Sequence, residues 1–96
     1  MIKVEVSKDC ISISGHANFD EYGKDIVCAA VSSTVLTTIN GILSIDNKSI
    51  KVEEGNNLII MIINHTDVVD KLLNNMIRCL KELEKKYEKN IKIKEE

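Results

Sequence analysis

The order of two kinds of segment constrains the fold of this chain most strongly. Apolar and charged residues alternate over residues 2–6, and the alternation resumes at Ile11 and Ile13 after a turn-like segment, residues 7–9. A period of two residues is typical of a β-strand with one buried face. The first part of the chain therefore predicts a β-hairpin.

A second hairpin is predicted in the middle of the chain. Residues 50–53 alternate again, Glu54-Gly55-Asn56-Asn57 supplies turn-forming residues, and residues 58–63 are continuously apolar. A run that is apolar on both faces is typical of a strand inside a sheet. We therefore expect the last strand of this hairpin to be central.

Each hairpin is followed by a segment of helical length. Residues 26–45 are too apolar for a surface helix, so we expect burial on more than one face, with Gly41 as an alternative earlier end. Serines and threonines in this segment would also fit strands, but 20 residues without a turn signal favour a helix. The second helix is predicted to begin after Asp67 as its N-cap. Its apolar stripe consists of Val69, Leu72, Leu73, Met76, Leu80, Leu83 and Tyr87.

These segments together predict the fold class. Ile91 and Ile93, flanked by lysines, indicate a short C-terminal edge strand. The chain is predicted to form one domain, residues 1–96, of the α+β class. Its expected architecture is a two-layer ββαββα sandwich with a mixed or antiparallel sheet and two helices.

Composition narrows the classes of function. A formal net charge of −2, a single arginine (Arg78) and three aromatic residues argue against a nucleic-acid-binding surface. No 18 consecutive residues are all apolar, and the first nine residues lack the pattern of a signal peptide, so we expect a cytoplasmic protein without a membrane span. Three cysteines without a CxxC pair indicate thiols rather than disulfides or a zinc site, and we expect no metal or cofactor.

Residues 15–24 form a longer connection than a strand-to-helix link requires. Gly15 and Gly23 bracket it, and it contains two of the three aromatic residues, Phe19 and Tyr22. Aromatic side chains on a mobile loop often contact a ligand. The alternative, which the sequence leaves open, is that both rings fold back over the core.

A cysteine follows this loop at the start of the predicted helix. If Asp25 caps the helix, Cys28 is its third residue, where backbone N–H groups and the helix dipole favour a thiolate. His16 is a candidate partner for that thiolate, and Ser32, one turn later, is a candidate support for the thiolate or a substrate carbonyl. Packing at Cys28, a back-bond at Ser32 and a purely capping Asp25 remain alternatives.

The other cysteines and the second histidine are weaker candidates for catalytic residues. Cys10 and Cys79 do not begin a helix, and we interpret both as structural. His65 is expected to face solvent at a strand–helix junction.

The string Gly15-His16-Ala17, followed by Gly23-x-Asp25-Ile26-Val27-Cys28-Ala29-Ala30-Val31-Ser32, resembles the signature of the ribosomal-processing cysteine protease family, Prp. The resemblance implies an endopeptidase that removes an N-terminal extension from a bacterial large-subunit ribosomal protein, number twenty-seven, during ribosome assembly. It also implies a homodimer.

The resemblance assigns roles to individual residues. His16 and Cys28 would be the catalytic dyad, and Asp25 and Ser32 would be supporting positions. The loop from Gly15 to Gly23, with Phe19 and Tyr22, would close on the substrate. The competing hypothesis is a non-enzymatic assembly factor that binds a ribosomal protein through the same loop.

Overall fold

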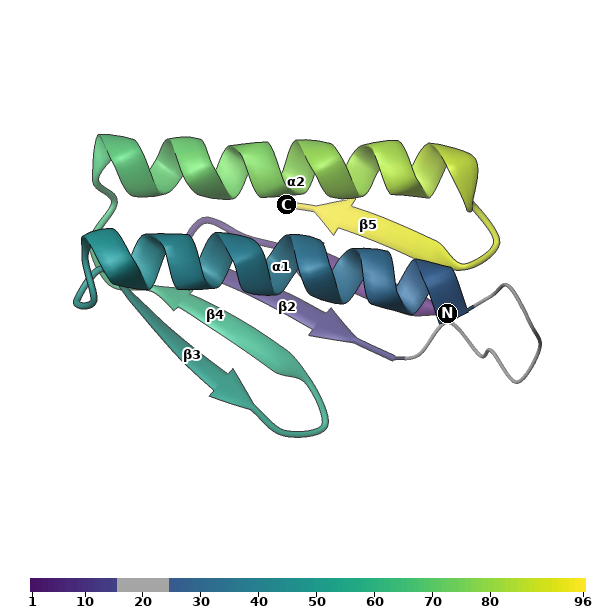
Figure 1. The fold of residues 1–96 in the computed structure, drawn as a ribbon, viewed down its shortest axis with the longest axis horizontal. Helices are drawn as coiled ribbons and strands as arrows, with labels where there is room; N and C mark the ends of the chain where they lie inside the picture. Colours follow the sequence, from purple (N-terminus) through teal and green to yellow (C-terminus); the bar gives the residue numbers. More distant parts are fainter. Residues whose placement is uncertain (16–24) are drawn as a thin grey trace.

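The computed structural model describes residues 1–15 and 25–96. These form five strands and two helices in the predicted order (Figure 1). The elements are β1 (Ile2–Val6), β2 (Cys10–Ser14), α1 (Asp25–Ile45), β3 (Ile50–Glu54), β4 (Leu58–Ile62), α2 (Asp67–Lys86) and β5 (Ile91–Glu95). The predicted α+β fold with a C-terminal strand is confirmed.

The strands form one mixed sheet in the order β3-β4-β2-β1-β5. Both hairpins are antiparallel, β2 pairs antiparallel with β4, and β5 joins the edge of the sheet parallel to β1. The apolar strand β4 is therefore an interior strand, paired on both sides as its sequence predicts. The strand at the centre of the sheet is β2.

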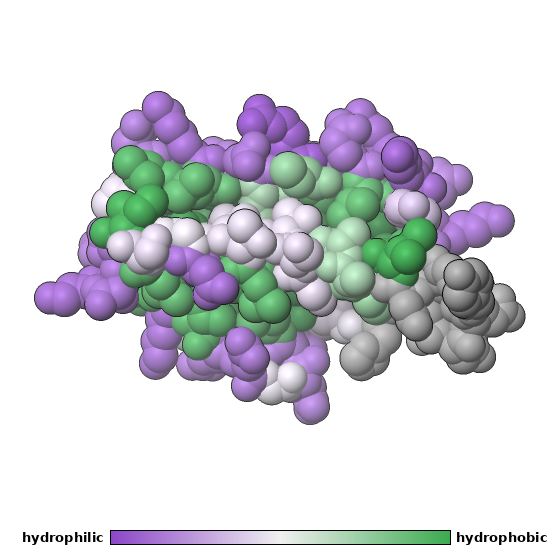
Figure 2. All heavy atoms as spheres, viewed as in Figure 1, coloured by the Kyte–Doolittle hydropathy of each residue, from purple (hydrophilic) through white to green (hydrophobic). Residues whose placement is uncertain are grey.

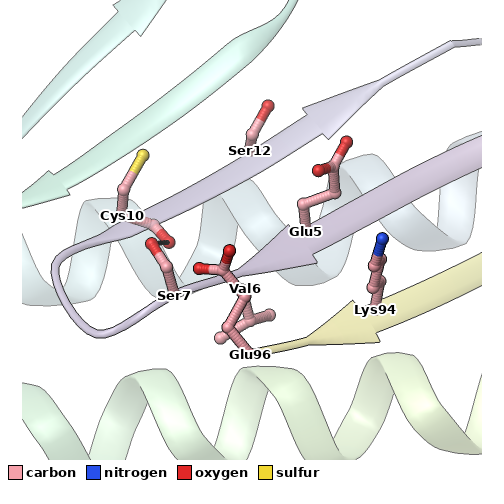
Figure 3. A pocket seen from close by; sticks show the side chains of 7 residues that line it. All are labelled: Glu5, Val6, Ser7, Cys10, Ser12, Lys94 and Glu96. Carbon is pink, nitrogen blue, oxygen red and sulfur yellow. Dashed lines mark hydrogen bonds between the residues drawn. The ribbon is translucent and has the colours of Figure 1, made fainter.

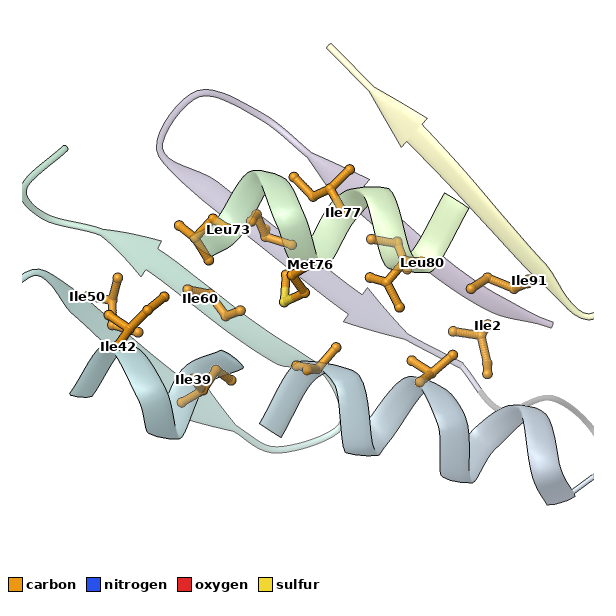
Figure 4. Packing of buried hydrophobic residues seen from close by; sticks show 14 of the residues in the cluster. Ile2, Ile39, Ile42, Ile50, Ile60, Leu73, Met76, Ile77, Leu80 and Ile91 are labelled. Atoms are coloured by element: carbon orange, nitrogen blue, oxygen red, sulfur yellow. The ribbon is translucent and has the colours of Figure 1, made fainter. Parts of the chain in front are cut away.

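Both helices pack on the same face of the sheet and against each other. The core between the two layers consists of alternate strand residues and one stripe from each helix (Figure 4). The fully buried larger side chains include Val4, Ile11, Val35, Ile42, Ile60, Met76, Leu80 and Ile91. In the described part of the chain, no helix covers the opposite face of the sheet, which carries mainly Lys, Glu and Ser side chains.

Helix α1 packs on the sheet and, along one flank, against α2, so the expectation of burial on more than one face is confirmed only in part. Because both helices form a single layer, no element within residues 1–15 and 25–96 covers the side of α1 away from the sheet. Ile26 and Leu36 are 54% and 44% exposed there. Figure 2 views this helix side, where apolar residues gather around α1 and hydrophilic residues line the outer edge of α2. Gly41 does not end the helix, which continues to Ile45.

The second helix begins one residue earlier than predicted. Its N-cap is Thr66, whose hydroxyl accepts a hydrogen bond from the Val69 N–H at 3.1 Å. Asp67 is instead the first helical residue, where a carboxylate interacts favourably with the helix dipole. Both residue types are good caps, so the sequence alone did not separate them.

Residues 26–45 of α1 are long and apolar enough to cross a membrane by length and composition. A mostly buried core helix of a soluble protein and a signal sequence near the N-terminus pass the same test, so one such helix is weak evidence. Here 28% of its most apolar stretch is buried. The buried residues of α1 face the sheet.

Candidate active site

Cys28 lies in the first turn of α1. The helix begins at Asp25, so Cys28 is its fourth residue rather than the third. Its side chain is half-buried and packs against the hydrophobic core. The sulfur therefore lies at the boundary between core and surface, close to the backbone N–H groups that the start of a helix presents. This is where a nucleophile and an oxyanion-binding site can share one element.

Ser32 follows Cys28 by four residues and lies on the same side of α1. Its side chain is exposed. Ser32 lines a groove between α1 and the β3–β4 hairpin, a cavity of about 270 Å³. The structure thus connects the Cys28 side of α1 to a hollow on the surface.

Gly15 has a role that its sequence position alone did not reveal. It follows the last residue of β2 and has a φ of 81°, a conformation that L side chains rarely adopt. A Cβ atom at this position would lie far inside van der Waals contact with the carbonyl oxygen of Met1. Only glycine allows the chain to leave β2 so close to the start of β1, immediately before His16.

The remaining predicted site residues are described only in part. His16, Phe19, Tyr22 and Gly23 lie outside the described residues, so the proximity of His16 to Cys28 and the closing of the loop stay predictions. Asp25 is described as the first residue of α1. The residue before it, which would be the cap, lies outside the described residues.

His65 makes an arrangement that the sequence analysis missed. Its Nε2 lies 2.8 Å from Asp9 Oδ1, and its Nδ1 lies 2.8 Å from Asp70 Oδ1. Since carboxylates only accept, a ring that bonds to both must donate from both nitrogens and is an imidazolium. Hydrogen bonds to Asp9 and then Asp70 raise the pKa of His65 above 6.5. The ring joins the β1–β2 turn to the start of α2. These two segments lie at the end of the molecule where α1 finishes (Figure 1).

Cys10 and Cys79 lie away from any helix start. Cys10 is half-buried on the open face of the sheet, in a shallow hollow that Glu5 and Lys94 also line, with the helices behind the sheet (Figure 3). The Ser7 hydroxyl donates to the Cys10 carbonyl at 3.0 Å. Cys79 is exposed on α2, in the second half of that helix. Among residues 1–15 and 25–96, no group of three or more His, Cys, Asp or Glu residues is arranged to hold a metal.

The fold and the position of Cys28 point to one class of protein, the cysteine peptidases. The sequence model of the family Cysteine protease Prp matches residues 1–92. The chain belongs to this family and is a cysteine protease.

Relatives of known name and structure agree with this assignment. The ribosomal processing cysteine protease Prp of Staphylococcus aureus is 28% identical over 87 residues, which cover 86% of this chain and 82% of that protein. A protein of the same name from Mycoplasma genitalium is 51% identical over 35 residues, 36% of this chain and 35% of that protein.

The solved structures show the same fold over the whole chain. A crystal structure of the S. aureus protease Prp with a covalently linked product peptide has a TM-score of 0.90 and 25% identity, and each chain is covered completely. A Streptococcus mutans protein has a TM-score of 0.86 and 21% identity, with 99% of this chain and 93% of that chain covered. The second likeness is one of fold alone.

Proposed function

We propose that this protein, folded as one domain, is an endopeptidase that removes the N-terminal extension of a bacterial large-subunit ribosomal protein, number twenty-seven. The observation that carries the proposal is Cys28, half-buried in the first turn of α1, in a chain of the Prp family. The relatives from S. aureus and M. genitalium are named as ribosomal processing proteases, and the S. aureus protein holds a covalently linked product peptide.

The proposed reaction uses Cys28 and His16 in two steps. The Cys28 thiolate attacks the scissile carbonyl, and backbone N–H groups at the start of α1 hold the negatively charged oxygen. His16 protonates the leaving amine, so the C–N bond breaks and a thioester forms. His16 then takes a proton from water, which attacks the thioester and releases the new carboxyl terminus and the thiolate. No metal or cofactor takes part in this scheme.

Other residues of the signature support this dyad in the proposal. Asp25 and Ser32 are supporting positions beside the dyad. Gly15, Phe19, Tyr22 and Gly23 belong to a segment that closes on the substrate and completes the site.

The test of the proposal is cleavage of the ribosomal protein with its extension, followed by intact-mass analysis. Cys28→Ala should abolish cleavage and keep the fold, because Ala29 and Ala30 show that small side chains suit this part of α1. Cys79→Ala is the matched control, since Cys79 is exposed on α2. Cleavage by Cys28→Ala would disprove the role of Cys28. Binding of the precursor by the wild-type protein without cleavage would favour the assembly factor.

We further propose that two copies associate through the outer side of α1. Residues 26–45 contain no charged side chain, and the exposed apolar residues Ile26, Leu36 and Leu43 lie on this helix. With Ala29, they recur at spacings of three, seven and seven residues, which places them on one face. An exposed apolar stripe on a charge-free helix is typical of a surface that pairs with its own copy.

The mass in solution tests this association. Leu43→Glu should convert a dimer into a monomer, whereas Asn74→Glu on the exposed side of α2 should not. Light scattering after size-exclusion chromatography measures both. A monomeric wild-type protein would contradict the proposal. We also propose that the protein acts in the cytoplasm and binds neither nucleic acid nor a membrane. Fractionation of cells would test its location.

A further inference from the structure

The C-terminal strand β5 forms one edge of the sheet, and one side of its backbone is paired with β1. The Ile2 N–H donates to the Asn90 carbonyl at 2.9 Å, and the Glu96 N–H donates to the Val6 carbonyl at 2.9 Å. Because alternate residues of a strand bond to the same neighbour, the N–H groups of the residues between them point away from the sheet, where another strand could bind. These residues are Ile91, Ile93 and Glu95.

Helix α2 lies alongside β5, and its C-terminal part occupies two of these N–H groups (Figure 1). The Ile91 N–H donates to the Tyr87 carbonyl, at the end of the helix, at 3.2 Å. The Ile93 N–H donates to Glu84 Oε2 at 2.7 Å. A carboxylate that accepts from an N–H makes a charge-assisted bond, which is stronger than a bond between neutral groups. The Glu84 side chain thus lies where the carbonyl of an added strand would be.

The contacts between α2 and β5 follow a regular register. Lys81, three residues before Glu84, forms an ion pair with the Glu95 side chain. Positions 81, 84 and 87 therefore meet positions 95, 93 and 91. Residues three apart lie on one face of a helix, and residues two apart lie on the same side of a strand. A single face of α2 thus runs along the whole outer edge of β5.

The chain itself contains a segment that would fit this edge. Strand β1 has the sequence Ile-Lys-Val-Glu-Val, and β5 has Ile-Lys-Ile-Lys-Glu. They pair in parallel with Ile2 opposite Ile91, so residues of the same kind lie side by side at the first three positions. Residues 2–6 of another copy would find the same pattern on the outer side of β5. An edge strand with free N–H groups accepts such a segment, which starts aggregation.

We propose that the Glu84 carboxylate guards the β5 edge: by occupying the Ile93 N–H, it prevents residues 2–6 of another, unfolded copy of the chain from pairing there. The guard takes no part in the chemistry proposed for Cys28. Its failure in the test below would therefore leave the proposed function unaffected.

The chain offers a matched set of variants on α2. Glu84→Ala removes the carboxylate, and Glu84→Asp keeps the charge on a side chain that is one methylene shorter. Glu84→Gln keeps a side-chain oxygen of the same reach that accepts a hydrogen bond. Glu82→Ala is the control, because Glu82 is exposed on the same helix and its ion pair is with the exposed Lys85, 3.6 Å away.

The probe is a labelled synthetic peptide with the sequence of residues 1–7, and fluorescence anisotropy measures its binding to each folded protein. Glu84→Ala should bind the peptide about tenfold or more tightly than the wild type, since the peptide no longer has to displace a charge-assisted hydrogen bond. Glu84→Asp should bind it too, whereas Glu84→Gln and Glu82→Ala should bind it as weakly as the wild type. A scrambled peptide without the alternation should bind to none of them.

Hydrogen exchange, followed by NMR, locates the effect on the sheet. The Ile93 amide should exchange at least about tenfold faster in Glu84→Ala than in the wild type, because it has lost its acceptor. Adding the peptide should slow this exchange again. The amides of β3, the other edge strand, should exchange alike in both proteins.

Two results would overturn the guard. The first is equally weak peptide binding by the wild type, Glu84→Ala and Glu84→Asp, which would leave Glu84 only as a fastening between α2 and β5. The second is binding that protects the amides of β3 instead of those of β5. If Glu84→Ala does not fold, Glu84→Asp provides the same test. Cleavage of the ribosomal precursor by the wild type is measured separately and decides the proposed function alone.

Discussion

Replacing the glycine that precedes the proposed catalytic histidine should cost both stability and activity. At a φ of 81°, Gly15→Ala carries about 1–2 kcal/mol for the left-handed conformation of an L residue. The new Cβ would also collide with the Met1 carbonyl oxygen, a backbone atom that no side-chain rotation can move aside. The total cost is therefore at least about 1–2 kcal/mol, or a fall of roughly 5–15 °C in the melting temperature of a domain this small.

The activity of the same variant separates stability from positioning. Because the strain is relieved by moving the chain at Gly15, the backbone leading into His16 must shift. Cleavage by Gly15→Ala, measured well below its melting temperature, should fall more than tenfold, since misplacing a catalytic group by about 1 Å costs about 100-fold.

Gly41→Ala is the matched control. Gly41 lies inside α1, and a Cβ atom there meets nothing within 4 Å. Alanine in a helix interior is favoured over glycine by about 0.5–1 kcal/mol, so this variant should melt a few degrees higher and keep its activity. Thermal unfolding and cleavage assays on both variants test the pair. A Gly15→Ala protein as stable and as active as the wild type would refute the reasoning.

Two further predictions concern the junction between β4 and α2. Thr66→Ala should lower the free energy of unfolding, measured by urea denaturation, by about 0.5–2 kcal/mol, whereas Thr66→Ser should change it little. A larger loss for Asp67→Ala than for Thr66→Ala would show that Asp67 is the cap instead. The pKa of His65, followed by NMR, should lie above 6.5, and Asp9→Asn should lower it more than Asp70→Asn. Because folding raises this pKa, the imidazolium bridge stabilises the protein below about pH 6.5, and that stabilisation is lost as the pH rises through the raised value. Equal stability of wild type and Asp9→Asn across pH 5–8 would contradict it.

The fold could be predicted because its signals are local. Period-two alternation in β1, β2 and β3 and the apolar stripe of α2 each specify an element without information from the rest of the chain. The exposure of α1 could not be predicted in the same way. Its sequence is apolar on several faces, and only the arrangement of layers decides which of them the sheet covers.

The same distinction applies to the candidate site: the relation between residues of one element could be predicted, whereas contacts between distant elements could not. Cys28 and Ser32 lie within one helix, so their shared side follows from spacing alone. The groove combines Ser32 with Glu54 on a hairpin more than 20 positions away, and no pattern within either segment connects them. His65 and Asp9 are 56 positions apart, and their hydrogen bond depends on the pairing of β2 with β4.

The unusual composition of α1 follows from the demands on its surface. Residues 26–45 include no Asp, Glu, Lys or Arg, although 29% of the chain is charged. The side with Val27, Val31 and Ile42 faces the core, where an unpaired charge is costly. In our proposal the outer side pairs with a second copy, and this surface loses water when the two copies associate. A charge on the outer side of α1 should therefore be tolerated if the protein is a monomer and should separate the two copies if it is a dimer. Leu43→Glu tests whether pairing of two copies explains why α1 is as apolar as a membrane span.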